Sequence, residues 1–99
     1  MPLDIYNLNT NEHIFALNDD LYDLLFSAFE HHYQQTGLFI DQYGDLTLDI
    51  NQQKELLDSV SHYLSAQTTI KQNNKPLMEF LELLNDCIRN NIVIRFLGD

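Results

Sequence analysis

The amino-terminal half of this chain lacks positively charged side chains. The first 53 of the 99 residues contain no lysine and no arginine, yet they carry nine aspartates and glutamates. The remaining 46 residues hold six acids and five bases, so they add only −1 to the net charge of −10. Phosphate binding requires clustered lysine and arginine. The sequence therefore predicts a protein that binds neither nucleic acid nor anionic membrane surfaces.

Cysteine and long hydrophobic runs are also scarce. Cys87 is the only cysteine, so no disulfide can form within the chain, which suits a reducing cytosol. No stretch approaches the ~18 consecutive apolar residues of a membrane-spanning helix. The first residues, Met1 to Tyr6, include neither a basic segment nor a long apolar one, so no secretory signal is expected. We therefore predict a cytoplasmic protein.

Catalytic signatures are missing as well. The three glycines (Gly37, Gly44 and Gly98) are isolated, so they do not form a phosphate-binding loop. No residue is placed as a base beside Cys87, which is predicted to be a small packed side chain. Two carboxylates can always be found among fifteen acids, and their presence does not indicate acid–base catalysis. The sequence predicts no enzyme and no cofactor.

The histidines do not predict a metal site. His31 and His32 are adjacent, and neighbouring residues on a helix point about 100° apart. Chelation from a helix uses residues three or four apart. Both histidines are instead expected to complement the helix dipole near its carboxyl end.

Asp41, Asp45 and Asp49 recur at four-residue intervals, but they do not match a calcium-binding loop. An EF-hand loop that starts at Asp41 would need an oxygen ligand at its third position, glycine at its sixth and glutamate at its twelfth. Those positions hold Tyr43, Leu46 and Gln52. Asp45 is predicted to form a turn hydrogen bond and Asp49 to cap the following helix. No metal is expected.

Apolar residues recur with helical spacing in three segments. The first helix is predicted to start at Asn18 or Asp19 and to stop at Thr36–Gly37. The second should begin after Asp49 or Asn51, and the third around Pro76. The predicted inner face of the first helix is Leu21, Leu24, Leu25, Ala28 and Phe29. That of the second is Leu56, Leu57, Val60 and Leu64, with Tyr63 beside them. That of the third is Leu77, Phe80, Leu81, Leu84 and Ile88.

Two to four short strands complete the pattern. Leu3–Leu8 and Ile92–Leu97 are predicted to be adjacent strands, while His13–Leu17 reads either as a strand or as the start of the next helix. Gly44 permits a positive φ, so a tight turn is expected near it, and the remaining short strands would flank that turn. Gln67–Asn74 is predicted to be a loop. We therefore expect one domain, residues 1–99, of the α+β class, with helices covering one face of a small sheet.

A second apolar line, formed by Tyr22, Phe26 and Tyr33, lies beside the leucine stripe of the first helix. The helix is therefore either central to the core or presents an aromatic flank to a partner, and central burial is the favoured interpretation.

Tyrosines are interleaved with the nine acids of the first half, and tyrosine is common at interface hot spots. Acids around it would attract a basic protein. The alternative is that the acids only confer solubility. The residues predicted to bind a partner are Asp19, Asp20, Asp23, Asp41, Tyr43 and Asp45.

The segment Ile40–Leu48, followed by Gln52, Gln53, Leu56 and Leu57, resembles a group of small bacterial proteins of undefined function, as does the end Phe96-Leu97-Gly98-Asp99. In size and acidity the chain is also similar to bacterial immunity proteins, including those of contact-dependent growth inhibition. That resemblance implies a tight one-to-one complex with a toxin domain, often a basic nuclease, whose active site is blocked. The alternative is a homodimeric adaptor, regulator or secretion chaperone that uses the Tyr22, Phe26 and Tyr33 flank as its interface.

Overall fold

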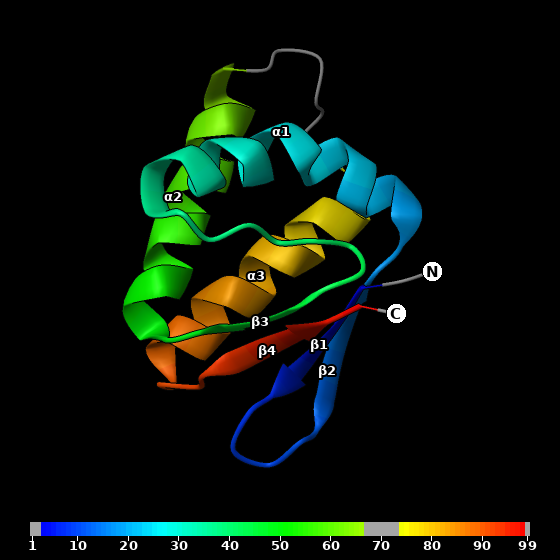
Figure 1. Cartoon of the computed structure of the whole chain (residues 1–99), viewed down its shortest axis with the longest axis vertical. Helices are drawn as coiled ribbons and strands as arrows, with labels where there is room; N and C mark the ends of the chain where they lie inside the picture. Colours follow the sequence, from blue (N-terminus) through cyan, green and yellow to red (C-terminus); the bar gives the residue numbers. More distant parts are fainter. Residues whose placement is uncertain (1–2, 67–73, 99) are drawn as a thin grey trace.

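Four antiparallel strands form one sheet, on which three helices pack (Figure 1). A computed structural model of the chain describes residues 3–66 and 74–98, without the side chains of residues 64–66. The sheet order is β2-β1-β4-β3. The strands are β1 (Leu3–Asn7), β2 (His13–Leu17), β3 (Asp45–Leu48) and β4 (Ile94–Leu97), and the helices are α1 (Asp19–Thr36), α2 (Ile50–Ala66) and α3 (Lys75–Arg89). The predicted α+β class is confirmed, and so is the pairing of the first and last strands.

Local capping interactions mark both ends of α1 and the start of α2. The Asn18 carboxamide accepts a hydrogen bond of 2.8 Å from the Leu21 N–H at the start of α1. Gly37 ends that helix in the left-handed conformation, with φ of 77°. At the start of α2, Asp49 and Gln52 each bond the other's backbone N–H at 2.8 Å, which is a capping box. Because each cap involves neighbours in the sequence, these helix limits were predictable.

Burial alternates along β1 and β4, the two central strands of the sheet. Leu3, Ile5, Ile94 and Phe96 are buried, whereas the residues between them are partly exposed. The buried side chains meet the helices, which lie on one side of the sheet (Figure 1). The buried core comprises Leu3, Ile5, Leu17, Leu21, Tyr22, Leu25, Ala28, Phe29, Ile40, Leu48, Leu56, Val60, Leu77, Phe80, Leu84, Cys87, Ile94 and Phe96. Leu24, Leu57, Tyr63 and Leu81 from the predicted inner faces are only partly buried.

The structure resolves one open alternative, confirms one turn and corrects one strand boundary. Residues 13–17 form β2, the edge strand beside β1. The turn expected near Gly44 is present, and the Gly44 N–H donates to the Asp41 carbonyl at 3.1 Å. Gly44 does not use the positive φ that glycine permits, because among the described glycines only Gly37 has one. β4 begins at Ile94 and not at Ile92, because the Ile92 N–H bonds the Cys87 carbonyl at 2.9 Å and so belongs to the end of α3. Most of the predicted loop Gln67–Asn74 and the side chain of Leu64 lie outside the described residues.

The turn at residues 41–44 lies directly against the end of β4. The Gly98 N–H donates to the Gly44 carbonyl at 2.7 Å. A Cβ atom at Gly98 would lie 2.1 Å from the Gln42 carbonyl oxygen, so only glycine fits this contact. Gly98 thus lets the two backbones approach and fixes the turn on the surface. Within the described parts of the chain, no helix has the length and hydrophobicity needed to cross a membrane.

Candidate protein-binding surface

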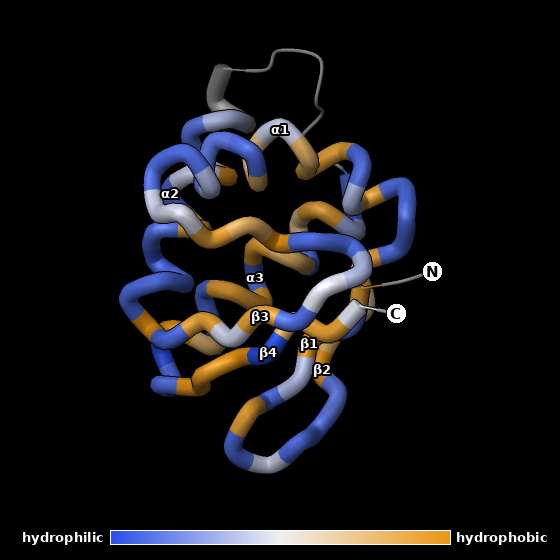
Figure 2. Tube along the Cα trace, in the orientation of Figure 1, coloured by the Kyte–Doolittle hydropathy of each residue, from blue (hydrophilic) through white to orange (hydrophobic). Residues whose placement is uncertain are grey.

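The helix α1 and the turn at residues 41–44 together form one surface. After α1 the chain returns along the helix, between α1 and β3 (Figure 1), through a hydrophobic stretch at residues 38–40 that leads into the polar turn (Figure 2). The Tyr22 hydroxyl donates to the Ile40 carbonyl at 2.7 Å. The Gln42 side chain donates to the Asp19 carboxylate at 2.8 Å. These two bonds hold the turn beside the first half of the helix.

We call the resulting feature the acidic aromatic surface. Three of its aromatic side chains are strongly exposed: Phe26 at 39%, Tyr33 at 51% and Tyr43 at 66%. Neither α1 nor the segment 37–44 contains a lysine or arginine. The surface comprises Asp19, Asp23, Phe26, Glu30, Tyr33, Phe39, Asp41 and Tyr43.

The electrostatics of Tyr22 show that this surface is negative. The pKa of Tyr22 is raised, first because the side chain is buried, and then because the carboxylates of Asp41 and Asp23 disfavour a phenolate there. The same two carboxylates would stabilise a positive charge brought to the surface. The protein thus presents a negative potential around exposed aromatic rings.

Four of the six predicted partner-binding residues lie on this surface: Asp19, Asp23, Asp41 and Tyr43. Asp20 does not. It lines a small cavity of about 160 Å³ with Asn74 and Pro76, at the start of α3. Successive residues at the start of a helix point in different directions, so Asp19 and Asp20 face different neighbours.

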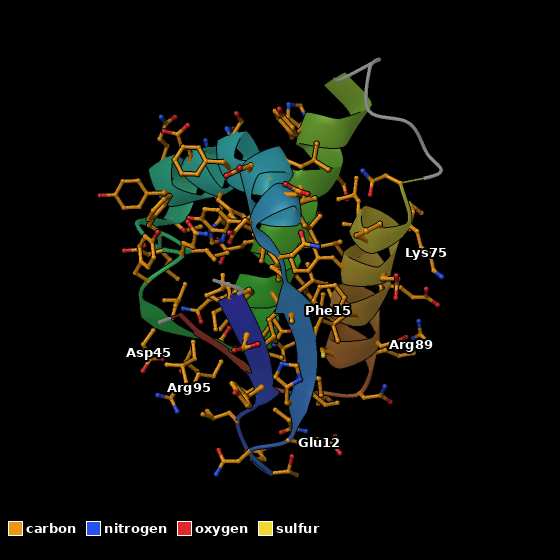
Figure 3. All side chains as sticks on the ribbon, turned by 90° about the vertical axis from the view of Figure 1, so that its right-hand side faces the viewer. Glu12, Phe15, Asp45, Lys75, Arg89 and Arg95 are labelled. Atoms are coloured by element: carbon orange, nitrogen blue, oxygen red, sulfur yellow. The ribbon has the colours of Figure 1, made fainter. Side chains whose placement is uncertain are left out.

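Asp45 forms an ion pair and does not make the turn hydrogen bond predicted for it. It forms a two-pronged ion pair with Arg95 of β4, at 2.9 and 2.7 Å (Figure 3). The hydrogen bonds from Arg95 hold the pKa of Asp45 below its ordinary value. The turn hydrogen bond expected of Asp45 is made by Asp41, whose carboxylate accepts from the Tyr43 N–H at 3.0 Å. Strand pairing thus neutralises one acid of the first half with a base of the second.

His32 contradicts the expectation that it complements the helix dipole as a cation. Its side chain is fully buried, and its Nδ1 donates to the Leu38 carbonyl at 3.1 Å. Its Nε2 is buried and finds no hydrogen-bond partner among the described residues. Burial lowers the pKa of His32 because the imidazolium would lose its hydration. His32 is therefore a neutral core residue at pH 7.

The remaining cysteine and histidine side chains either pack in the structure or lie apart from one another. Cys87 is buried in the core, as predicted, and burial raises the pKa of its thiol. The rings of His31 and His62 stack at 6.0 Å across α1 and α2. In the described parts of the chain, no three histidine, cysteine, aspartate or glutamate side chains are grouped to hold a metal ion.

Central burial of the aromatic flank is correct for Tyr22, which is 5% exposed, but wrong for Phe26 and Tyr33. Those two rings pack against Phe39, at centroid distances of 6.0 and 5.7 Å. Phe39 was not predicted as part of the surface. Residues 38–40 are all apolar, so their sequence has no alternation that would show which of them is buried. The partial exposure of Phe39 was therefore not predictable from the sequence.

The structure is therefore that of a small α+β protein with acidic side chains around exposed aromatic rings. No protein-family model matches the chain, no curated protein matches it, and no solved structure matches it.

Proposed function

We propose that this protein is a cytoplasmic inhibitor that binds a basic enzyme through the acidic aromatic surface and blocks its active site, as immunity proteins block their toxins. The observation that carries the proposal is the surface itself, where Asp23, Glu30 and Asp41 surround exposed aromatic rings and no lysine or arginine occurs in the segments that form it.

Both components of the surface suit this role. Carboxylates around a binding site increase the rate of encounter with a basic protein and disfavour acidic competitors. Phe26, Tyr33 and Tyr43 supply apolar area that is already exposed and partly fixed by ring contacts. In a complex with a nuclease, Asp23 and Asp41 would occupy the positions of the substrate phosphates. A toxin nuclease domain is therefore the partner class that we favour.

Three of the described bases lie away from the surface or are already paired. Figure 3 shows Lys75 and Arg89 on α3, at the opposite side of the view from Asp45, the residue that follows the turn. Arg95 is already paired with Asp45. These three bases therefore leave the carboxylates of Asp23 and Asp41 available to a partner.

A second candidate function uses the same aromatic rings in another way. Phe26 and Tyr33 could form the interface of a homodimeric adaptor or chaperone, with the acids serving only solubility. Their exposures of 39% and 51% favour an interface of either kind. The homodimer differs in that no basic partner is required.

The proposal is tested by isolating the partner and measuring its activity. The tagged protein is used to capture partners from the source cell, and each partner is then purified and recombined with it. A one-to-one complex in which a basic enzyme loses its activity would support the proposal. A stable complex only with a second copy, or a basic partner that stays fully active when bound, would contradict it.

The double variant Asp23→Asn/Asp41→Asn locates the interface in that complex. It should weaken inhibition by about tenfold or more, because it removes charges at the contact. Glu79→Gln/Glu82→Gln is the matched control, since it changes the net charge equally at two exposed positions on α3. Equal effects of the two double variants would show that only net charge matters.

A further inference from the structure

A groove on the acidic aromatic surface has the chemistry of a cation site. Its walls are Glu30, Tyr33, Gln34 and Phe39, and its volume is about 470 Å³. That volume lies within the range of about 300–1,000 Å³ typical of ligand pockets. Glu30, Tyr33 and Gln34 are three and four residues apart on α1, so they share one face of the helix. Phe39 closes the groove from the returning segment.

The aromatic walls are held in a fixed arrangement. Phe39 contacts Tyr33 at 5.7 Å with the ring planes 73° apart, and it contacts Phe26 at 6.0 Å with the planes 89° apart. Edge-to-face contacts of this kind stabilise the ring positions. Tyr33 is still 51% exposed, so its ring remains accessible to a ligand. A positive group placed over the ring would be attracted by its negative face.

Glu30 supplies the carboxylate of the groove. In the described parts of the chain, the recorded ion pairs involve Asp4, Asp86 and Asp45, and none involves Glu30. The amide of Gln34 adds a hydrogen-bond acceptor in the same groove. A carboxylate, an amide oxygen and an exposed aromatic ring together are complementary to a planar cation with several N–H donors.

We infer that the groove of Glu30, Tyr33, Gln34 and Phe39 binds the guanidinium group of an arginine side chain. The guanidinium is planar, stacks on aromatic rings and donates two parallel hydrogen bonds to a carboxylate. A lysine ammonium is a compact, strongly hydrated charge and fits this combination less well. The assignment rests on the proposed function, because the arginine would belong to the basic partner.

The test uses a small probe and the whole protein without its partner. Isotope-labelled protein is titrated with N-acetyl-argininamide at constant ionic strength, and backbone and side-chain NMR shifts are followed. We expect saturable shifts at the four groove residues and much smaller shifts with N-acetyl-citrullinamide, which is a nearly isosteric neutral analogue. No saturable shifts at the groove, or equal shifts with the neutral analogue, would overturn the assignment.

Variants separate the ring from the carboxylate. Tyr33→Ala and Glu30→Gln should each weaken binding of the probe by about two- to fivefold, whereas Tyr33→Phe should retain it, because the aromatic face is kept. Glu82→Gln on α3 is the charge-matched control and should bind as the wild type does. If Tyr33→Ala and Glu30→Gln both bind normally, the assignment is wrong.

The result of the probe titration can be distinguished from the result of the inhibition test. An absence of probe binding together with strong inhibition of a basic enzyme would refute the groove and leave the proposed function standing. Probe binding by a protein that forms only homodimers would refute the proposed function instead.

Discussion

The close approach of Gly98 to Gln42 holds the 41–44 turn against the end of β4. Gly98→Ala would place a Cβ atom 2.1 Å from the Gln42 carbonyl oxygen, so the turn and the end of β4 must separate. We expect the free energy of unfolding to fall by about 1–3 kcal/mol, measured by urea denaturation.

Gly37→Asn is the control for this substitution. It also adds a side chain, but nothing lies within 4 Å of its Cβ position, and asparagine tolerates the left-handed conformation. Gly37→Asn should lower the free energy of unfolding clearly less than Gly98→Ala does. Equal losses in the two variants would show that the close approach at Gly98 does not affect stability.

His32 should make stability depend on pH. Its pKa is lowered in the folded protein, so below the ordinary value of 6.5 the unfolded chain binds a proton that the folded protein does not. The free energy of unfolding contributed by this residue is therefore fully present above that value, and it falls as the pH drops toward the folded pKa. Urea denaturation at about pH 7 and pH 5.5 measures the change.

The variant His32→Gln isolates this contribution. It should lose less stability than the wild type between the two pH values, because it lacks the buried imidazole whose pKa is lowered in the folded protein. A pH dependence that is identical in wild type and His32→Gln would contradict the account of His32.

At the scale of elements, the cap of α2 gives a direct prediction. Asp49→Ala removes one side of the reciprocal hydrogen bonds with Gln52, so an N–H group at the start of the helix loses its partner. We expect destabilisation of about 1 kcal/mol by urea denaturation.

Asp58→Ala is the matched control, because Asp58 lies within the same helix at an exposed position and makes no cap. It should change stability by about 0.5 kcal/mol or less. A loss as large as that of Asp49→Ala would mean that the cap is not the cause.

Elements with local signals were predicted well, and elements that depend on distant contacts were not. Asn18, Gly37 and Asp49 act on neighbours within a few residues, so the sequence shows where α1 starts and ends and where α2 starts. The role of Asp45 could not be predicted, because its partner Arg95 is fifty positions away and reaches it only through strand pairing.

The same distinction applies to the candidate surface. The acids of the first half are visible in the sequence, and four of the six predicted residues do lie together. The contribution of Phe39 depends on how the segment after Gly37 returns along α1, and that path is set by the Tyr22–Ile40 and Gln42–Asp19 hydrogen bonds. Such contacts have no signature in a single sequence.

For the whole molecule, the two candidate functions predict different masses in solution. An inhibitor waiting for its partner should be a monomer, so light scattering should give about the chain mass of 11.6 kDa. A stable dimer that Phe26→Ser converts to a monomer would favour the homodimeric alternative and contradict the proposed function.

The salt dependence of association with the purified partner tests the central claim most directly. For the wild type, the association rate constant should fall steeply as salt rises, because electrostatic attraction is screened. Asp23→Asn/Asp41→Asn should associate about tenfold more slowly at low salt and show a flatter dependence, while Glu79→Gln/Glu82→Gln should remain close to the wild type. An association rate and a salt slope that are the same in wild type and Asp23→Asn/Asp41→Asn would contradict the claim that the acidic aromatic surface binds a basic protein.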